Sequence, residues 1–273
     1  MQSQNLQEHR EPQQQEELLD FLLHYATIQT SVGVQTSRIV LNTSRIAETY
    51  GYDTTMMMFQ RNVAITLTPR AETTEKASRQ SLPMTALTHH RTLPLNFYLN
   101  AELSRLSWYI HDNRPQIETL NDLLETTLKA PKINSWIILL LISIANAAFC
   151  LLFGGDTWGA VFVFVGTLLG FFARQELNKR HAYHYLTVLI AAFISSLTVG
   201  LGSLTGFSAT PEIALGASVL YLIPGVPFIN SMMDFLDGYM LNGTSRLINA
   251  IFIVISITVG LSGTLVLLNL NLL

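Results

Sequence analysis

The chain has 273 residues, a formal net charge of −3 and one cysteine, Cys150. A single cysteine excludes disulfide bonds within the chain and cysteine-based metal cages, and the small net charge gives no indication of nucleic-acid binding. Residues 1–132 hold 12 Lys and Arg and 14 Asp and Glu, whereas residues 133–273 hold only 4 and 5. We therefore interpret the first part as soluble and the second as inserted in a membrane.

Residues 1–15 are rich in Gln and Glu and lack the apolar run of a secretory signal peptide. They predict a disordered tail and an N-terminus that stays on the side of the membrane where it is made. Residues 16–132 then predict a cytoplasmic α+β domain. Apolar residues at helical spacing indicate a helix over 16–31 that ends at Gly33. Further helices are expected over 36–50, 96–112 and 115–128, and strands over 54–59, 63–67 and 84–92.

Three histidines of this domain invite a metal-binding interpretation, namely His89, His90 and His111. Adjacent residues of a strand point to opposite faces, so His89 and His90 cannot chelate one ion together. Surface or core positions explain all three better, and we expect neither a metal nor a cofactor. The sequence contains no glycine-rich nucleotide loop and no H-E-x-x-H motif, which disfavours ATP-driven chemistry.

Five hydrophobic runs follow the soluble domain, and each approaches or exceeds the length that a helix needs to cross the hydrocarbon layer. The second is the marginal one. The sequence therefore predicts an α-helical polytopic membrane protein with an N-terminal α+β domain. The five predicted spans cover about residues 136–153, 158–173, 185–201, 213–233 and 247–268.

Basic residues outside the spans predict the orientation, because positively charged loops stay cytoplasmic. The connections 154–157 and 202–212 carry no Lys or Arg, and neither does the C-terminus. The N-terminal domain should therefore be cytoplasmic and the C-terminus periplasmic, which requires an odd number of spans. All basic residues of this part of the chain fall on the cytoplasmic side: Lys129, Lys132, Arg174, Lys179, Arg180 and Arg246.

The fourth hydrophobic run is interrupted by Pro224, Gly225 and Pro227. Two prolines three residues apart make a continuous helix improbable, because each removes a backbone hydrogen bond and clashes with the preceding turn. Within lipid, such a break is tolerated only where the freed backbone faces protein or a water-filled cavity. The break is either a packing kink or a functional site, and we favour the site. Free amides at the start of a half-helix bind carboxylates.

Five polar residues near the membrane are further candidates. Asn146 lies in the middle of the first span and could join helices or contact a solute. Asn230, one turn after the break, could bind solute or satisfy the broken backbone. Asp234 and Asp237 share a helix face and are candidates for proton coupling, against the simpler interpretation of a solvated helix end. For Glu212 we prefer a helix-start charge to a proton-transfer role.

Several segments carry a resemblance to a known family: Gly33 to Gly51 with Arg38 and Arg45, Gly154-Gly155, Arg174-Gln175, and Pro224 to Asn230 with Asp234 and Gly238. In this order they resemble the threonine/serine exporter (ThrE) family, over nearly the whole chain after residue 16. The resemblance is closest to the larger subunit of the split, two-component form, which has a cytoplasmic domain and about five spans. It implies a separate small multi-span membrane subunit. It also implies proton-driven export of threonine/serine-type amino acids or four-carbon dicarboxylates across the bacterial inner membrane.

The number of spans agrees with that resemblance. Many transporters contain two repeats with the solute site between them, and five spans without an internal repeat look like half of such a structure. We therefore expect a subunit of a secondary exporter and no enzyme activity. The alternative is a membrane-anchored enzyme or sensor whose cytoplasmic domain carries the activity. Activity in the isolated domain 1–132, unaffected by changes at Pro224 and Pro227, would favour that alternative.

Overall fold

A computed structural model describes five stretches of the chain, with side chains from residue 12 onward. They are residues 2–59, 62–70, 82–89, 95–129 and 133–269. The chain divides into two compact units. The first contains residues 1–131 and 227–246, and the second contains residues 132–226 and 247–273. The membrane-type segment between residues 227 and 246 thus belongs with the N-terminal domain.

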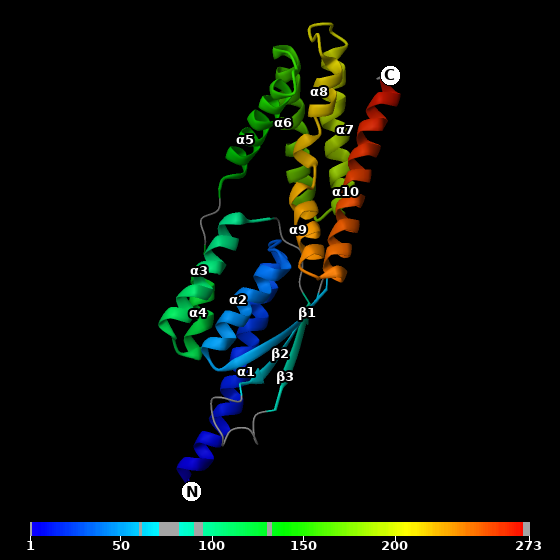
Figure 1. Cartoon of the computed structure of the whole chain (residues 1–273). Coiled ribbons are helices and arrows are strands. Elements are labelled where there is room, and N and C mark those ends of the chain that lie inside the picture. The colour runs from blue at the N-terminus through cyan, green and yellow to red at the C-terminus, as the bar shows by residue number, and fades with distance from the viewer. Residues whose placement is uncertain (1, 60–61, 71–81, 90–94, 130–132, 270–273) are drawn as a thin grey trace. The chain divides into compact units, whose positions relative to one another are not determined.

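Most of the first unit is a three-stranded antiparallel sheet of order β1-β2-β3 with helices packed on it. Helices α1 and α2 contact the sheet, and α3 packs on α2 and α4 (Figure 1). This arrangement confirms the predicted α+β character. The elements are α1 Gln2–Ser31, α2 Thr36–Thr49, β1 Tyr52–Met58, β2 Asn62–Pro69, β3 Met84–His89, α3 Phe97–Asn113, a short 3-10 helix η3 Ile117–Thr119 and α4 Leu120–Leu128.

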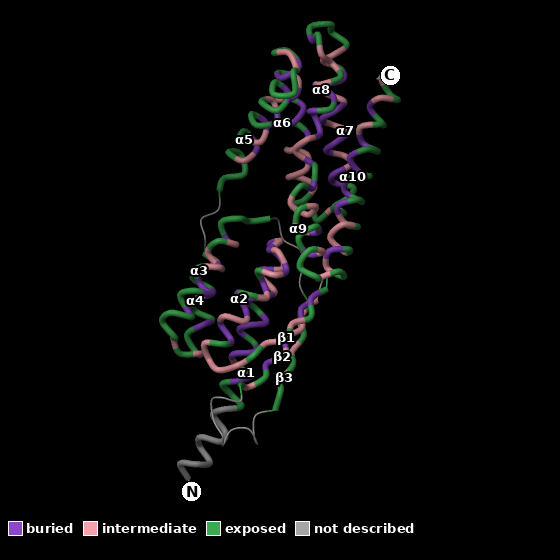
Figure 2. Tube along the Cα trace, viewed as in Figure 1, coloured by how far each residue is buried: buried purple, intermediate pink, exposed green. Residues whose placement is uncertain are grey.

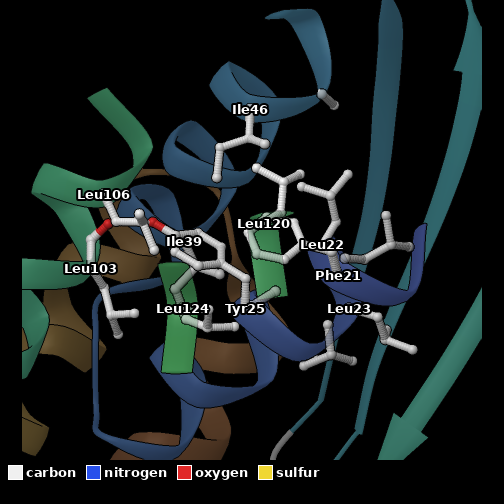
Figure 3. Packing of buried hydrophobic residues seen from close by; sticks show 14 of the residues in the cluster. Phe21, Leu22, Leu23, Tyr25, Ile39, Ile46, Leu103, Leu106, Leu120 and Leu124 are labelled. Atoms are coloured by element: carbon white, nitrogen blue, oxygen red, sulfur yellow. The ribbon is translucent and has the colours of Figure 1, made fainter. Parts of the chain in front are cut away.

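The core of this domain follows from the alternation of side chains along the central strand. Val63, Ile65 and Leu67 are fully buried, and the residues between them are only partly buried. Helices supply the other side of the core, as Figure 3 shows for α1, α2, α3 and α4. Tyr25 lies among these apolar side chains, and its hydroxyl donates to the carbonyl of Leu103 at 2.7 Å. Burial raises the pKa of Tyr25 above its ordinary value.

The start of α1 differs from the disordered tail predicted for residues 1–15. The helix begins at Gln2 and runs through Pro12. Gln15 is only 3% exposed, and its side-chain nitrogen donates to the carbonyl of Leu82 at 3.1 Å. A tertiary contact thus holds residues that composition alone marks as a tail.

The second unit holds the remaining helices except for residues 227–246, which include most of α9 and the start of α10. Four of them, α5, α6, α7 and α10, are long and apolar enough to cross a membrane. A fifth span is formed if α8 with η4 and α9 are taken together, with a bend of 61° between them. The described part of the chain therefore confirms a polytopic membrane protein. The elements are α5 Ser135–Leu152, α6 Thr157–Lys179, α7 His184–Ser203, α8 Pro211–Ala217, the 3-10 helix η4 Leu220–Leu222, α9 Gly225–Leu236 and α10 Met240–Leu267.

Two of these helices are longer than the hydrophobic runs that predict them. The second predicted span ends at residue 173, yet α6 continues through Arg174 to Lys179. The fifth begins at residue 247, yet α10 begins at Met240 and includes Arg246. Arg, Lys, Glu and Gln are good helix formers, so a charged residue ends an apolar run without ending the helix.

Helices α6 and α7 pack closely because small residues line the contact. A Cβ atom at Gly166 would lie 2.7 Å from the carbonyl oxygen of Ser195, so only glycine fits there. Along α10, buried residues alternate with exposed ones, as expected of a helix with one packed face (Figure 2). At the end of the unit that holds the α5–α6 connection, Asp156 accepts hydrogen bonds from Ser208 and Thr210, which hold the pKa of its carboxyl below the usual range.

Candidate functional site around the broken span

The break in the fourth span lies before the second proline. Helix α8 ends at Ala217, η4 follows, Ile223 is extended, and α9 begins at Gly225. Pro224 therefore occupies the break itself. Pro227 is the third residue of α9, where a missing N–H removes a donor that a helix leaves unpaired in any case. The predicted break is present, but Pro227 is compatible with the helix that follows it.

Asn146 supports the interrupted backbone. This residue of α5 is 2% exposed, and its side-chain nitrogen donates to the Thr167 hydroxyl at 2.6 Å and to the Ala217 carbonyl at 3.0 Å. Ala217 is the last residue of α8, so its carbonyl is one that a helix end leaves without an intrahelical donor. Both hydrogens of the Asn146 amide are used in these bonds. The contacts favour the helix-joining role among the two that the sequence leaves open.

Asn230 and Asp237 of the α9 region contact the turn between α1 and α2. The Asn230 side-chain nitrogen donates to the carbonyl of Gly33 at 2.9 Å. The Gln35 side chain donates to Asp237 at 2.9 Å, on the exposed edge of the contact. Gly33 has a φ of 81°, which ends α1 and turns the chain toward α2. Both polar residues thus have protein partners in the first unit.

Asp234 lies at the centre of the same contact and is 0% exposed. Its carboxylate accepts from the Thr36 backbone N–H at 3.2 Å and from the Thr36 hydroxyl at 3.1 Å. Nε of Arg246 lies 3.3 Å from the same carboxylate, and Nη2 of Arg246 donates to the Val34 carbonyl at 2.8 Å. Asn242 donates to the Thr36 hydroxyl at 3.2 Å. A buried ion pair therefore joins the α9–α10 hairpin to the first turn of α2.

This contact completes the start of α2. Gln35 is the N-cap residue, and its side chain makes no capping hydrogen bond. The carboxylate of Asp234 takes that place, where negative charge is favoured by the helix dipole. In the sequence, Arg246 serves only as an orientation marker, and Asn242 is not among the candidate residues. One sequence feature could have predicted the pair of Asp234 and Arg246. Gly238 forms the turn that folds α10 back on α9, and this turn brings an acidic and a basic residue of an apolar hairpin together.

Glu212 and the histidines make fewer contacts. Glu212 is exposed in the first turn of α8, directly after Pro211, which suits a helix-start charge. His89 bonds with Asn62 at 2.9 Å, and His111 with Asp112 at 2.9 Å. His90 lies outside the described residues. Within the described stretches, no group of three His, Cys, Asp or Glu side chains is arranged to hold a metal ion.

These features point to a class, because discontinuous helices in a polytopic membrane protein are typical of membrane transporters. The model of one family, with the description "Putative threonine/serine exporter" (ThrE), matches residues 20–268. The chain belongs to this family, as its residues predict.

Two curated bacterial relatives are similar over part of the chain, and both carry the name "Probable succinate transporter subunit YjjP". The protein of Klebsiella aerogenes is 37% identical over 112 residues, which are 41% of this chain and 43% of the relative. The protein of Escherichia coli K12 is 35% identical over 126 residues, which are 46% of this chain and 49% of the relative. The chain thus spans about half the length of the curated relatives it matches. No solved structure matches it.

Proposed function

We propose that this chain is one subunit of a secondary exporter of small carboxylate-bearing metabolites in the bacterial inner membrane. The family and the names of the two relatives support a membrane exporter over an enzyme. The candidate solutes are four-carbon dicarboxylates, as in the relatives' names, and amino acids of the threonine and serine type, as in the family's description.

The observation that carries this proposal is the 61° bend between the two halves of the fourth span. Free backbone groups at such a bend are accessible only where the break faces a polar interior. The start of α9 offers a positive dipole end, which favours a carboxylate. The Gly225 N–H there already donates to the Ile223 carbonyl at 2.9 Å, and Pro227 has no N–H, so the dipole rather than a set of free amides supports this proposal. Pro224 and Gly225 create this start, and Asn146 holds the carbonyl end of α8. Pro227 and Asn230 continue the same segment.

We also propose that a small multi-span membrane subunit accompanies this chain and that proton movement drives export. The word "subunit" in the relatives' names supports a partner, and the lack of a nucleotide-binding motif supports a secondary mechanism. Among the acidic candidates, Asp237 and Glu212 are exposed, whereas Asp234 is buried beside Arg246. Asp234 is therefore our first candidate for the proton-coupling group, with a carboxyl that is protonated in one state and ion-paired with Arg246 in another.

Efflux measurements test the exporter and its partner together. Expressed alone in a host that lacks related exporters, this chain should leave efflux of preloaded succinate, threonine and serine at background. Co-expression with the subunit that co-purifies from native membranes should restore efflux of at least one of them, and a protonophore should stop it. Full efflux from this chain alone would contradict the need for a partner. No efflux of the three solutes by the complete complex would contradict the exporter.

Cysteine labelling tests the proposed orientation. With Cys150 replaced by alanine, a reporter at Thr157→Cys should react with a membrane-impermeant maleimide in intact cells. A reporter at Lys179→Cys should react only after the membrane is opened. Both positions are exposed at opposite ends of α6, so access to the reagent depends on the side of the membrane. The reverse pattern would place the N-terminal domain outside the cytoplasm.

A further inference from the structure

Arg174 occupies an unusual position on α6. It lies one helical turn after Gly170, and residues four apart share a helix face. Gly170 is buried against two hydroxyl groups: a Cβ atom there would overlap Oγ of Ser195 and lie 2.6 Å from the oxygen of Tyr221. The face of α6 that bears Arg174 is therefore the face that packs on α7 and on η4.

The guanidinium of Arg174 has no acidic partner among the described residues. The other two basic residues at this end of α6, Lys179 and Arg180, both pair with Glu176. A partly buried cation within a membrane helix is expensive without a counter-charge, and such residues commonly mark solute or ion pathways. A long side chain can also reach the lipid headgroups. The exposed apolar face of α6, which suits contact with lipid, is instead formed by residues such as Leu169 and Phe172. Arg174 lies on a different face of the helix.

Two hydroxyl groups complete the surroundings. Oγ of Ser195 and the oxygen of Tyr221 are 2.8 Å apart, and the Tyr221 ring packs edge-on against Phe171. Tyr221 belongs to η4, two residues before the extended Ile223 at the break. A guanidinium with neighbouring hydroxyls is the donor set that binds a carboxylate by charge-assisted hydrogen bonds.

We propose that Arg174, with the hydroxyl of Tyr221 beside it, binds a carboxylate group of the transported solute at the end of η4. This inference rests on the proposed exporter function. It also sets a preference between the candidate solutes. An amino acid brings an ammonium group, which the like charge of Arg174 repels. A dicarboxylate supplies negative charge only, so it should bind better than threonine or serine.

The test measures binding and export with the full-length chain. The protein is purified from its native host with any subunit that accompanies it and placed in nanodiscs of neutral phosphatidylcholine. Succinate should raise its unfolding temperature, because a ligand that binds only the folded state stabilises it. Arg174→Gln should weaken the apparent succinate affinity by about 10- to 100-fold, the range for loss of a charged hydrogen-bonding partner. Threonine at the same concentrations should stabilise the unmodified protein less.

Matched variants separate this role from a structural one. Arg180→Gln removes an exposed cation from the same helix end and should leave succinate affinity unchanged. Tyr221→Phe keeps the ring contact with Phe171 and should weaken succinate binding without preventing insertion. If Arg174→Gln fails to insert, Arg174→Lys keeps the charge but loses the planar fork of donors, and it should still bind succinate more weakly.

The outcomes distinguish this inference from the exporter proposal. Unchanged succinate affinity in the inserted Arg174 variants overturns the site, as does the lack of any succinate effect on the unmodified protein. A third outcome is that anionic phosphatidylglycerol, but not succinate, stabilises the protein and that this effect requires Arg174. Arg174 would then bind a lipid phosphate, which also overturns the proposed site. Succinate binding that depends on Arg174, in a protein whose cells show no efflux, supports the site and refutes the exporter.

Discussion

Replacing Pro224, Gly225 and Pro227 together by alanine is expected to abolish export while the protein remains in the membrane. Alanine has the highest helix propensity, and proline costs about 3 kcal/mol in a helix interior, so the variant should extend α9 toward η4. A Cβ atom at Gly225 meets no neighbour within 4 Å, which means that the substitution brings no steric clash there. The helix start that we propose to face the carboxylate would then be lost within a continuous helix. Efflux of succinate, threonine and serine, normalised to inserted protein, measures the effect.

A single Pro227→Ala replacement is the matched control. Pro227 lies in the first turn of α9, where the helix is already formed, so this change should leave efflux close to the unmodified rate. Pro224→Ala alone should reproduce most of the loss seen with all three changes. If the triple-alanine protein exports at the unmodified rate, the break is a packing kink with no part in transport.

Replacing Asp234 by alanine should destabilise the first unit by roughly 3–5 kcal/mol, the range for removing one partner of a buried ion pair. Asp234 is 0% exposed and the Arg246 side chain is 22% exposed, so the cation left behind would be largely desolvated. The start of α2 would also lose its carboxylate. The apparent unfolding temperature of the purified protein and the rate of proteolysis between α1 and α2 measure the change.

Asp237→Ala is the control for that experiment, because Asp237 bonds with Gln35 on the exposed edge of the same contact. Exposed polar contacts contribute about 1 kcal/mol or less, so its effect should be small. Combining Asp234→Asn with Arg246→Gln should destabilise the protein by less than the sum of the two single changes. Equal effects of Asp234→Ala and Asp237→Ala would mean that the ion pair does not stabilise this contact.

Local patterns predict most of the elements. The alternation around Val63, Ile65 and Leu67 identifies the central strand, and the apolar spacing of α1 identifies its face. The prolines of the fourth span predict its break. Element ends are less predictable, because Arg174 and Arg246 continue helices beyond the apolar runs, and Gln15 depends on a contact with Leu82.

The partners of polar residues depend on contacts between distant parts of the chain. Asn146 and Asp234 are recognisable in the sequence as polar groups in apolar segments, but their acceptors and donors are not. Asn146 bonds with Thr167 and Ala217, and Asp234 bonds with Thr36, almost 200 residues away in sequence. A single sequence contains no periodicity that would reveal such pairs. That no acidic residue of the described stretches pairs with Arg174 becomes evident only from the structure.

The carboxylate at the start of α2 has a consequence for the biosynthesis of this protein. A chain leaves the ribosome from its N-terminus, and domains generally fold in that order. The sheet and the helices packed on it lie within residues 2–129 and are therefore synthesised long before Asp234 and Arg246. Until the fourth hydrophobic segment has been translated, the first turn of α2 lacks its charged partner. The N-terminal domain thus reaches its final structure only after most of the membrane helices have been made.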